Sequence, residues 1–181
     1  MHSLNIEKRM SITQQNLDLN PPKQSQFAQA NTALETLTIE TTRFGTITVT
    51  GAQLLQFVSP IIGFESVEYY ALLDHADDSP FKWLQAVNDP DLAFVVTNPI
   101  LFGFDYAFEL PTWAANGLNI TQTEQATIYT LVTIPEDNPR NMTANFLAPV
   151  IVNVDTHCAM QLVLQDTTLQ TRVKLLPDDA P

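Results

Sequence analysis

The sequence predicts an all-β protein, mainly antiparallel, that folds as a single domain with one or two short helices. Apolar and polar residues alternate with a period of two in many runs of the chain. Turn signals rich in Pro, Asp and Asn separate these runs at close spacing. Many short strands without long helices between them favour an antiparallel sandwich or barrel. The length of 181 residues favours one domain.

Residues 1–33 differ in composition from the rest of the chain. They contain a Pro-Pro pair, are rich in Gln, Asn and Ser over 11–33, and show little apolar periodicity. Such a segment cannot bury enough apolar surface to offset the entropy that it would lose on ordering. We therefore expect a disordered N-terminal extension over 1–33, followed by the barrel domain over 34–181.

The strand predictions rest on alternation. Residues 36–40 place Leu37 and Ile39 on one face, and residues 45–51 repeat the pattern. Threonines fill the opposite face of both runs, as is typical of half-buried strands. The remaining predicted strands are 68–74, 81–87, 92–97, 100–110, 126–134, 148–154, 159–165 and 168–176.

The run 81–87 carries aromatic and aliphatic side chains on one face, and so does the following run, 92–97. We expect these side chains to meet in the core, with Phe81, Trp83 and Val87 opposite Leu92, Phe94 and Val96. The residues between the two runs form a turn. On this interpretation the amide of Gln85 has to be satisfied by neighbouring backbone.

Helix signals are scarce. Residues 51–57 can form one or two helical turns. Residues 111–119 offer Thr112 as an N-cap and Gly117 as a C-terminal stop, which predicts a short helix there.

The charge balance narrows the class of partner. The chain has 8 Lys and Arg against 20 Asp and Glu, a net charge of −12. Direct nucleic-acid binding is disfavoured because neutralising phosphates requires basic groups, whereas a basic protein would be attracted. No apolar run approaches the roughly 18 residues of a membrane span. The single cysteine and the absence of a secretory signal favour a cytoplasmic location.

Catalytic and metal-binding patterns are missing from the sequence. His75 lies in DHADDS, but this stretch lacks the alternating oxygens, glycine turn and distal Glu of a calcium loop. His157 and Cys158 are adjacent, so on a strand they point to opposite faces. We expect no catalytic residue, no metal site and no cofactor.

Candidate partner-binding residues come from an apolar loop and an acidic turn. Ile61, Ile62 and Phe64 surround Gly63, where a turn with positive φ would suit glycine. An apolar loop of this kind either packs under the sheet or is exposed to a partner. With the neighbouring carboxylates, the candidate set is Ile61, Ile62, Phe64, Glu65, Asp77 and Asp78.

Several blocks occur in a recognisable order: RFGTITV, IIGFE, SPFKWLQAVNDPDLAFVVTNP, DYAFEL and TANFLAPVIVN, followed by Gln161. In this order they resemble the family of the flagellar assembly factor FliW. The matching blocks run from about residue 36 to residue 175, so the resemblance covers the whole predicted domain. The loop that contains Gly63 departs from the family, which usually has a Pro and two glycines there.

The resemblance implies a non-enzymatic cytoplasmic protein with a compact β-barrel-like fold. Proteins of this family bind flagellin before export. They also bind the translational regulator CsrA and so relieve its repression of flagellin messenger RNA. The expected partners are thus flagellin and a CsrA-type regulator, with no direct contact to nucleic acid or membrane and a monomeric free chain. An acidic antagonist suits CsrA because an RNA-binding protein carries a basic surface.

Two alternatives remain open. One is a small-ligand-binding β-barrel, or an enzyme built on such a barrel, which requires a concave pocket with converging polar groups. The other is a family member with a different, unknown partner in an organism without flagella.

Overall fold

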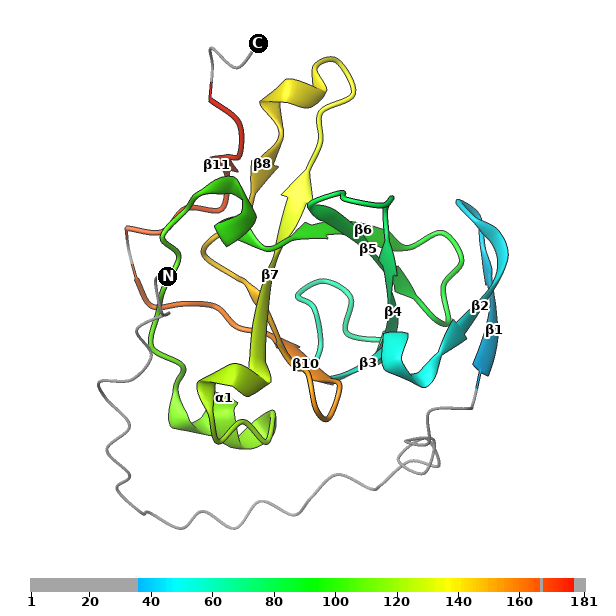
Figure 1. Ribbon diagram of the computed structural model, residues 1–181, viewed down its shortest axis with the longest axis horizontal. Helices are drawn as coiled ribbons and strands as arrows, with labels where there is room; N and C mark the ends of the chain where they lie inside the picture. The colour runs from blue at the N-terminus through cyan, green and yellow to red at the C-terminus, as the bar shows by residue number, and fades with distance from the viewer. Residues whose placement is uncertain (1–35, 167, 178–181) are drawn as a thin grey trace.

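The structure, a computed structural model, describes residues 36–166 and 168–177 (Figure 1). The predicted extension over 1–33 lies outside the described residues. No helix in the described part is long and apolar enough to cross a membrane.

A closed barrel forms the centre of the molecule (Figure 1). In the described part of the chain, seven strands follow one another around it, and pairing of β7 with β9 closes the ring. Neighbouring strands are antiparallel except for β3 and β10, which run parallel. This arrangement confirms the predicted fold class. In ring order the strands are β7 (Ala126–Thr133), β6 (Ala93–Thr97), β5 (Phe81–Ala86), β4 (Tyr69–Asp74), β3 (Leu54–Ser59), β10 (Cys158–Gln161) and β9 (Val150–Asn153).

Further elements lie around the barrel. The hairpin of β1 (Thr36–Thr41) and β2 (Gly45–Thr50) packs beside it, and β8 (Thr143–Ala144) and β11 (Val173–Lys174) extend the sheet beyond β7. One short α-helix, α1 (Thr112–Gly117), is present among the described residues. The 3-10 helices are η2 (Gly51–Gln53), η3 (Pro99–Phe102), η4 (Thr123–Gln125) and η5 (Pro139–Asn141).

Side chains fill the barrel interior. Tyr70, Leu84 and Val96 are buried there, and Ile61 enters the same cluster from the loop between β3 and β4. This loop lies inside the ring of strands in Figure 1. A second cluster covers the outer face of β7, β9 and β10 with α1 and the irregular segments around it, and a third lies under the β1–β2 hairpin. The hydrophobic effect therefore holds each peripheral element to the barrel.

Two predicted elements differ from the observed ones. Residues 51–57 do not form a helix beyond η2, because Leu55 and Phe57 alternate into the barrel as part of β3. Residues 100–110 do not form a ladder strand: η3 occupies the start of this stretch, and irregular chain follows it up to α1. Strand β1 is one residue longer than predicted, and β10 begins one residue earlier but ends sooner. The other predicted strands are shorter at one or both ends, and β8 was not predicted.

The predicted facing of β5 and β6 is wrong by one residue. In the observed register Trp83 lies opposite Val95, and Leu84 lies opposite Phe94. A shift of one residue exchanges the two faces of a strand. Leu84 and Phe94 therefore point into the barrel, whereas Trp83 faces outward.

The helix predicted over 111–119 is present as α1, but its start differs. Pro111 is the N-cap residue and Thr112 is the first helical residue, without a capping side-chain hydrogen bond. Gly117 is the last helical residue, as the sequence predicts.

Candidate partner-binding surface

The loop between β3 and β4 exposes one of its two isoleucines and buries the other. Ile61 is 1% exposed and belongs to the barrel core, whereas Ile62 is 62% exposed. The Ile62 amide donates to Gln161 Oε1 at 2.9 Å, which ties the loop to β10. Gly63 has a φ of +87°, a conformation that favours glycine. Ile61 is therefore a core residue of the candidate set, and Ile62 is its exposed apolar member.

Phe64 and Glu65 complete this loop. The Phe64 ring is half-buried and meets Phe94 edge-on, with ring centroids 4.9 Å apart. The Glu65 carboxylate accepts a hydrogen bond from the Gly63 amide at 2.9 Å. This bond, followed by one from the amide of Glu65 itself, lowers the pKa of the Glu65 carboxyl. The loop thus presents Ile62 beside a carboxylate that the loop backbone holds in place.

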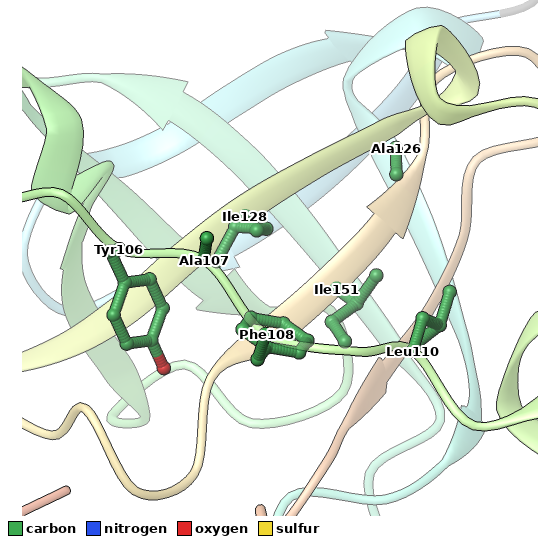
Figure 2. Close-up of a pocket in the computed structure, with 7 residues that line it drawn as sticks. All are labelled: Tyr106, Ala107, Phe108, Leu110, Ala126, Ile128 and Ile151. Atoms are coloured by element: carbon green, nitrogen blue, oxygen red, sulfur yellow. The ribbon is translucent and has the colours of Figure 1, made fainter. Parts of the chain in front are cut away.

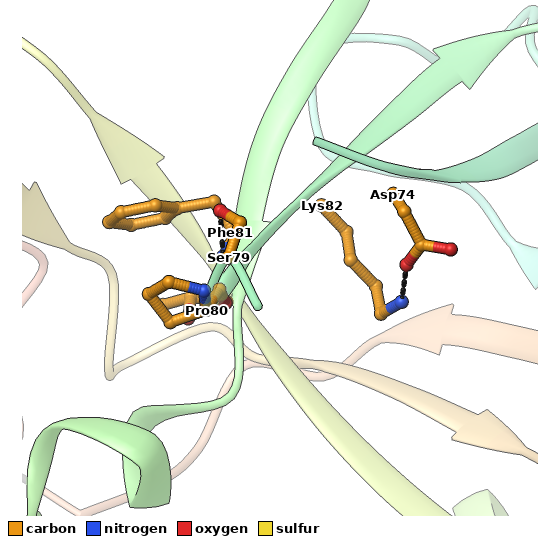
Figure 3. Close-up of polar contacts among 6 residues, drawn as sticks. Asp74, Ser79, Pro80, Phe81 and Lys82 are labelled. Atoms are coloured by element: carbon orange, nitrogen blue, oxygen red, sulfur yellow. Dashed lines mark hydrogen bonds and ion pairs between the residues drawn. The ribbon is translucent and has the colours of Figure 1, made fainter. Parts of the chain in front are cut away.

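Asp77 and Asp78 lie in the turn between β4 and β5, and both are exposed. Asp78 has a φ of +62°, which Asp tolerates better than most residues. The turn is closed by hydrogen bonds from the Ser79 amide to Ala76 O at 3.2 Å and from the Phe81 amide to Ser79 Oγ at 3.2 Å. Figure 3 shows the Ser79 contact and, beside the turn, the ion pair of Lys82 with Asp74.

The six candidate residues do not form one surface. The loop with Ile62 precedes β4, whereas the turn with Asp77 follows it. Six residues of strand separate the two by about 20 Å. A compact partner patch can include either the apolar loop or the acidic turn, and a contact to both would have to extend along β4.

A cluster that the sequence reasoning missed lies next to the acidic turn. Arg43 Cζ lies 4.4 Å from the ring centroid of Trp83, the His75 ring stacks on Trp83 at 6.0 Å, and Phe44 meets it edge-on at 5.7 Å. Trp and Arg are enriched among residues that dominate binding energy. The sequence signal was Phe44 next to Arg43 in the tight turn between β1 and β2, where a large aromatic residue has no core to enter.

The exposed groups near these candidate residues are of the kinds found at protein interfaces. The described residues contain no group of three His, Cys, Asp or Glu side chains that could hold a metal ion. What they do present is an exposed isoleucine, a partly exposed Trp with Arg and His against its ring, and several solvated carboxylates. Such a combination of apolar anchors and a charged rim is typical of protein interfaces.

Comparisons with known proteins agree on the family that this chain resembles. The family model "FliW protein" matches residues 38–175. The flagellar assembly factor FliW of Leptospira biflexa is 36% identical over 140 residues, which cover 77% of this chain and 92% of the relative. The factor of Bdellovibrio bacteriovorus is 39% identical over 134 residues, covering 74% and 76%.

A solved structure points to the same family. The crystal structure of a flagellar assembly factor FliW superposes with a TM-score of 0.73 at 28% identity, covering 80% of this chain and all of that one. From the match over most of the chain in both sequence and fold, the chain belongs to the FliW family of flagellar assembly factors.

Proposed function

We propose that this chain is a non-enzymatic cytoplasmic regulator that binds flagellin and a CsrA-type translational regulator. By binding the regulator it relieves repression of flagellin synthesis, and by binding flagellin it couples that synthesis to flagellum assembly. Membership of the FliW family carries this proposal. The free chain is proposed to be a monomer.

The charge distribution supports a basic partner. Between Glu65 and Glu109 the chain has nine acidic residues, and Lys82 is the only Lys or Arg. In the fold Lys82 is paired with Asp74, so it adds little positive potential. A negative surface raises the encounter rate with a cationic protein. An RNA-binding regulator has the complementary charge.

The filled barrel interior weakens the ligand-binding alternative. A small-molecule site needs a cavity with converging polar groups. Aliphatic and aromatic side chains occupy the interior instead, including Leu55, Leu84 and Phe94.

Direct binding tests the proposal. The purified chain is titrated calorimetrically with the CsrA-type regulator and, separately, with the flagellin from the same cell. We expect a saturable complex with each. A matched variant, Asp77→Asn with Asp78→Asn, should weaken the complex with the regulator. Failure of both partners to bind the wild-type chain at micromolar concentration would contradict the proposed function.

A further inference from the structure

The segment between η3 and α1 has the side-chain pattern of a strand. From Gly103 to Leu110 its residues alternate between exposed and packed positions. The inward side chains join the second core cluster, and the outward ones face solvent. The inward residues are Phe104, Tyr106, Phe108 and Leu110, and the outward residues are Asp105, Ala107 and Glu109.

The backbone of residues 105–110 has no hydrogen-bond partner in the described part of the chain. Among the residues that the structure describes, none exchanges a backbone hydrogen bond with residues 105–110, although bonds are present at both flanks, from Phe104 to Pro99 and from Ala114 to Pro111. Tyr106 is only 3% exposed, so the backbone groups of this stretch that can face water are those of the exposed residues Asp105, Ala107 and Glu109. An extended segment with free backbone groups is a template for another strand.

Side-chain contacts fix the segment in place. The Tyr106 hydroxyl donates a hydrogen bond to the carbonyl oxygen of Phe146, and the two rings lie 4.8 Å apart. Tyr106 and Phe108 meet at 5.6 Å. A strand that binds here would therefore dock on an ordered edge and lose little entropy in ordering it.

A small apolar pocket lies between this segment and the barrel (Figure 2). Its volume is about 20 Å³. Figure 2 shows Phe108 and Leu110 on the segment near Ile151, across a gap that Ala126 and Ile128 border. The pocket exposes apolar surface and has room for the tip of one aliphatic side chain.

The outward face determines which kind of strand fits. Asp105 and Glu109 would lie on the same face as alternate side chains of an added strand. In an antiparallel pairing with a second copy centred on Ala107, Asp105 would lie opposite Glu109, and like charges directly opposite are destabilising. Lys or Arg at the same positions of another chain would be attracted.

We propose that residues 105–110 form a β-augmentation site for an extended segment of a partner protein in which basic and aliphatic residues alternate. The basic residues pair with Asp105 and Glu109, an aliphatic residue enters the pocket, and main-chain hydrogen bonds hold the two backbones together. This inference deepens the proposed function, since it assigns a binding mode to a protein partner.

A peptide of alternating lysine and valine tests the site without either proposed partner. Its failure to bind would leave the proposed function standing, and failure of flagellin and the regulator to bind would leave this site standing. Hydrogen exchange of the full chain is followed by NMR with and without the peptide. We expect protection of every second amide within 105–110, because alternate N–H groups of a strand point to the same edge.

A charge exchange provides the matched control. Asp105→Lys with Glu109→Lys should weaken binding of the lysine–valine peptide at least about fivefold and create binding of a glutamate–valine peptide. The control, Glu136→Lys with Asp137→Lys, changes the net charge equally at exposed positions and should leave the affinity within about twofold of wild type.

Three results would overturn the proposal. The first is protection that is absent or not alternating in 105–110. The second is an equal loss of affinity in both double variants, which would show that only net charge attracts the peptide. The third is alternating protection in the free chain, because a segment of the chain itself would then occupy the edge.

Discussion

Tyr70 and Tyr106 are both buried, but their hydroxyl groups have different surroundings. The Tyr70 hydroxyl has no hydrogen-bond partner among the described residues, whereas that of Tyr106 donates to Phe146 O. A buried hydroxyl without a partner costs free energy, and a satisfied one contributes about 1 kcal/mol. We expect Tyr70→Phe to leave the free energy of unfolding unchanged or raise it by up to about 1 kcal/mol. Tyr106→Phe should lower it by about 1–2 kcal/mol.

Urea unfolding of the two variants measures this difference. Because both changes remove one hydroxyl oxygen, each serves as the control for the other. A Tyr70→Phe chain less stable than the Tyr106→Phe chain would show that the Tyr70 hydroxyl is the better satisfied of the two.

Gln85 shows what the sequence can predict at this scale. Its burial among apolar neighbours predicted an amide satisfied by nearby backbone. The Nε2 atom indeed donates to Leu92 O at 3.0 Å and to Asp89 O at 3.1 Å, which fixes the turn after β5. For the amide nitrogen the prediction held, because its partners lie within seven residues of Gln85, whereas the buried Oε1 atom has no hydrogen-bond partner among the described residues. The cluster around Trp83 joins residues from three separate segments, and no local pattern contained it.

At the scale of the element, the loop between β3 and β4 assigns different roles to its adjacent isoleucines. Ile61→Ala should lower the free energy of unfolding by about 2–4 kcal/mol, because it leaves a cavity in the barrel core. Ile62→Ala should change it by less than about 0.5 kcal/mol, because its side chain is mostly exposed. If the loop contacts a partner, Ile62→Ala speeds dissociation of the complex without slowing its formation.

Thermal unfolding and surface plasmon resonance separate the two effects on the same pair of variants. Equal destabilisation by both changes would contradict the burial of Ile61 alone.

Strand β5 gives a second element-scale prediction, which reverses the expectation from sequence. Leu84→Ala should cost about 3 kcal/mol because Leu84 fills the barrel interior. Trp83→Ala should cost less, about 1–2 kcal/mol, since it removes the contacts of a partly exposed ring with Arg43 and Phe44. Urea unfolding of the two variants measures which change lowers the free energy of unfolding more. If Trp83→Ala lowered the free energy of unfolding more than Leu84→Ala does, Trp83 would be a core residue and this assignment would be wrong.

The reason for the reversal is that alternation is a local property and register is not. Phe81 and Trp83 share one face of β5, as the alternation predicts, whereas Val87 follows the strand. Which face enters the barrel depends on pairing with β4 and β6, which one strand's pattern does not contain. The same limit explains residues 100–110, where the alternation is present but no ladder partner adjoins residues 105–110 in the described chain.

At the scale of the whole molecule, buried tyrosines connect stability to pH. Burial, with a smaller contribution from the charge of Asp89, raises the pKa of Tyr70 to about 12. Burial also raises the pKa of Tyr106 and of Tyr129. In the unfolded chain a tyrosine titrates near 10. The folded state therefore keeps these protons at a pH at which the unfolded state loses them.

The direction in which the free energy of unfolding changes with pH follows from proton binding. Above pH 10 the unfolded chain binds fewer protons than the folded one, so the free energy of unfolding falls as pH rises. The contribution is complete below about pH 10 and is lost as the pH approaches the folded pKa, about 12 for Tyr70. Urea unfolding at several pH values between 9 and about 11.5 measures the slope. A Tyr70→Phe chain should show a shallower fall, and an identical slope would contradict the raised pKa of Tyr70.

The fold class was predictable because it depends on repeated local signals: alternation, turn residues and scarce helix patterns. Closure of the barrel was not, since the pairing of β7 with β9 joins residues more than 20 positions apart in sequence. That long-range closure also determines which loops lie together. The separation of the apolar loop from the acidic turn by β4 could therefore not be read from residue types.

The association rate with the CsrA-type regulator tests the central claim most directly, namely that an acidic FliW-family surface recognises a basic regulator. Stopped-flow mixing is carried out at low and high ionic strength with the wild-type chain and the Asp77→Asn, Asp78→Asn variant. We predict that the wild-type association rate constant falls about tenfold or more with salt, and that the variant associates more slowly but dissociates at the same rate. An association rate indifferent to salt would contradict the claim.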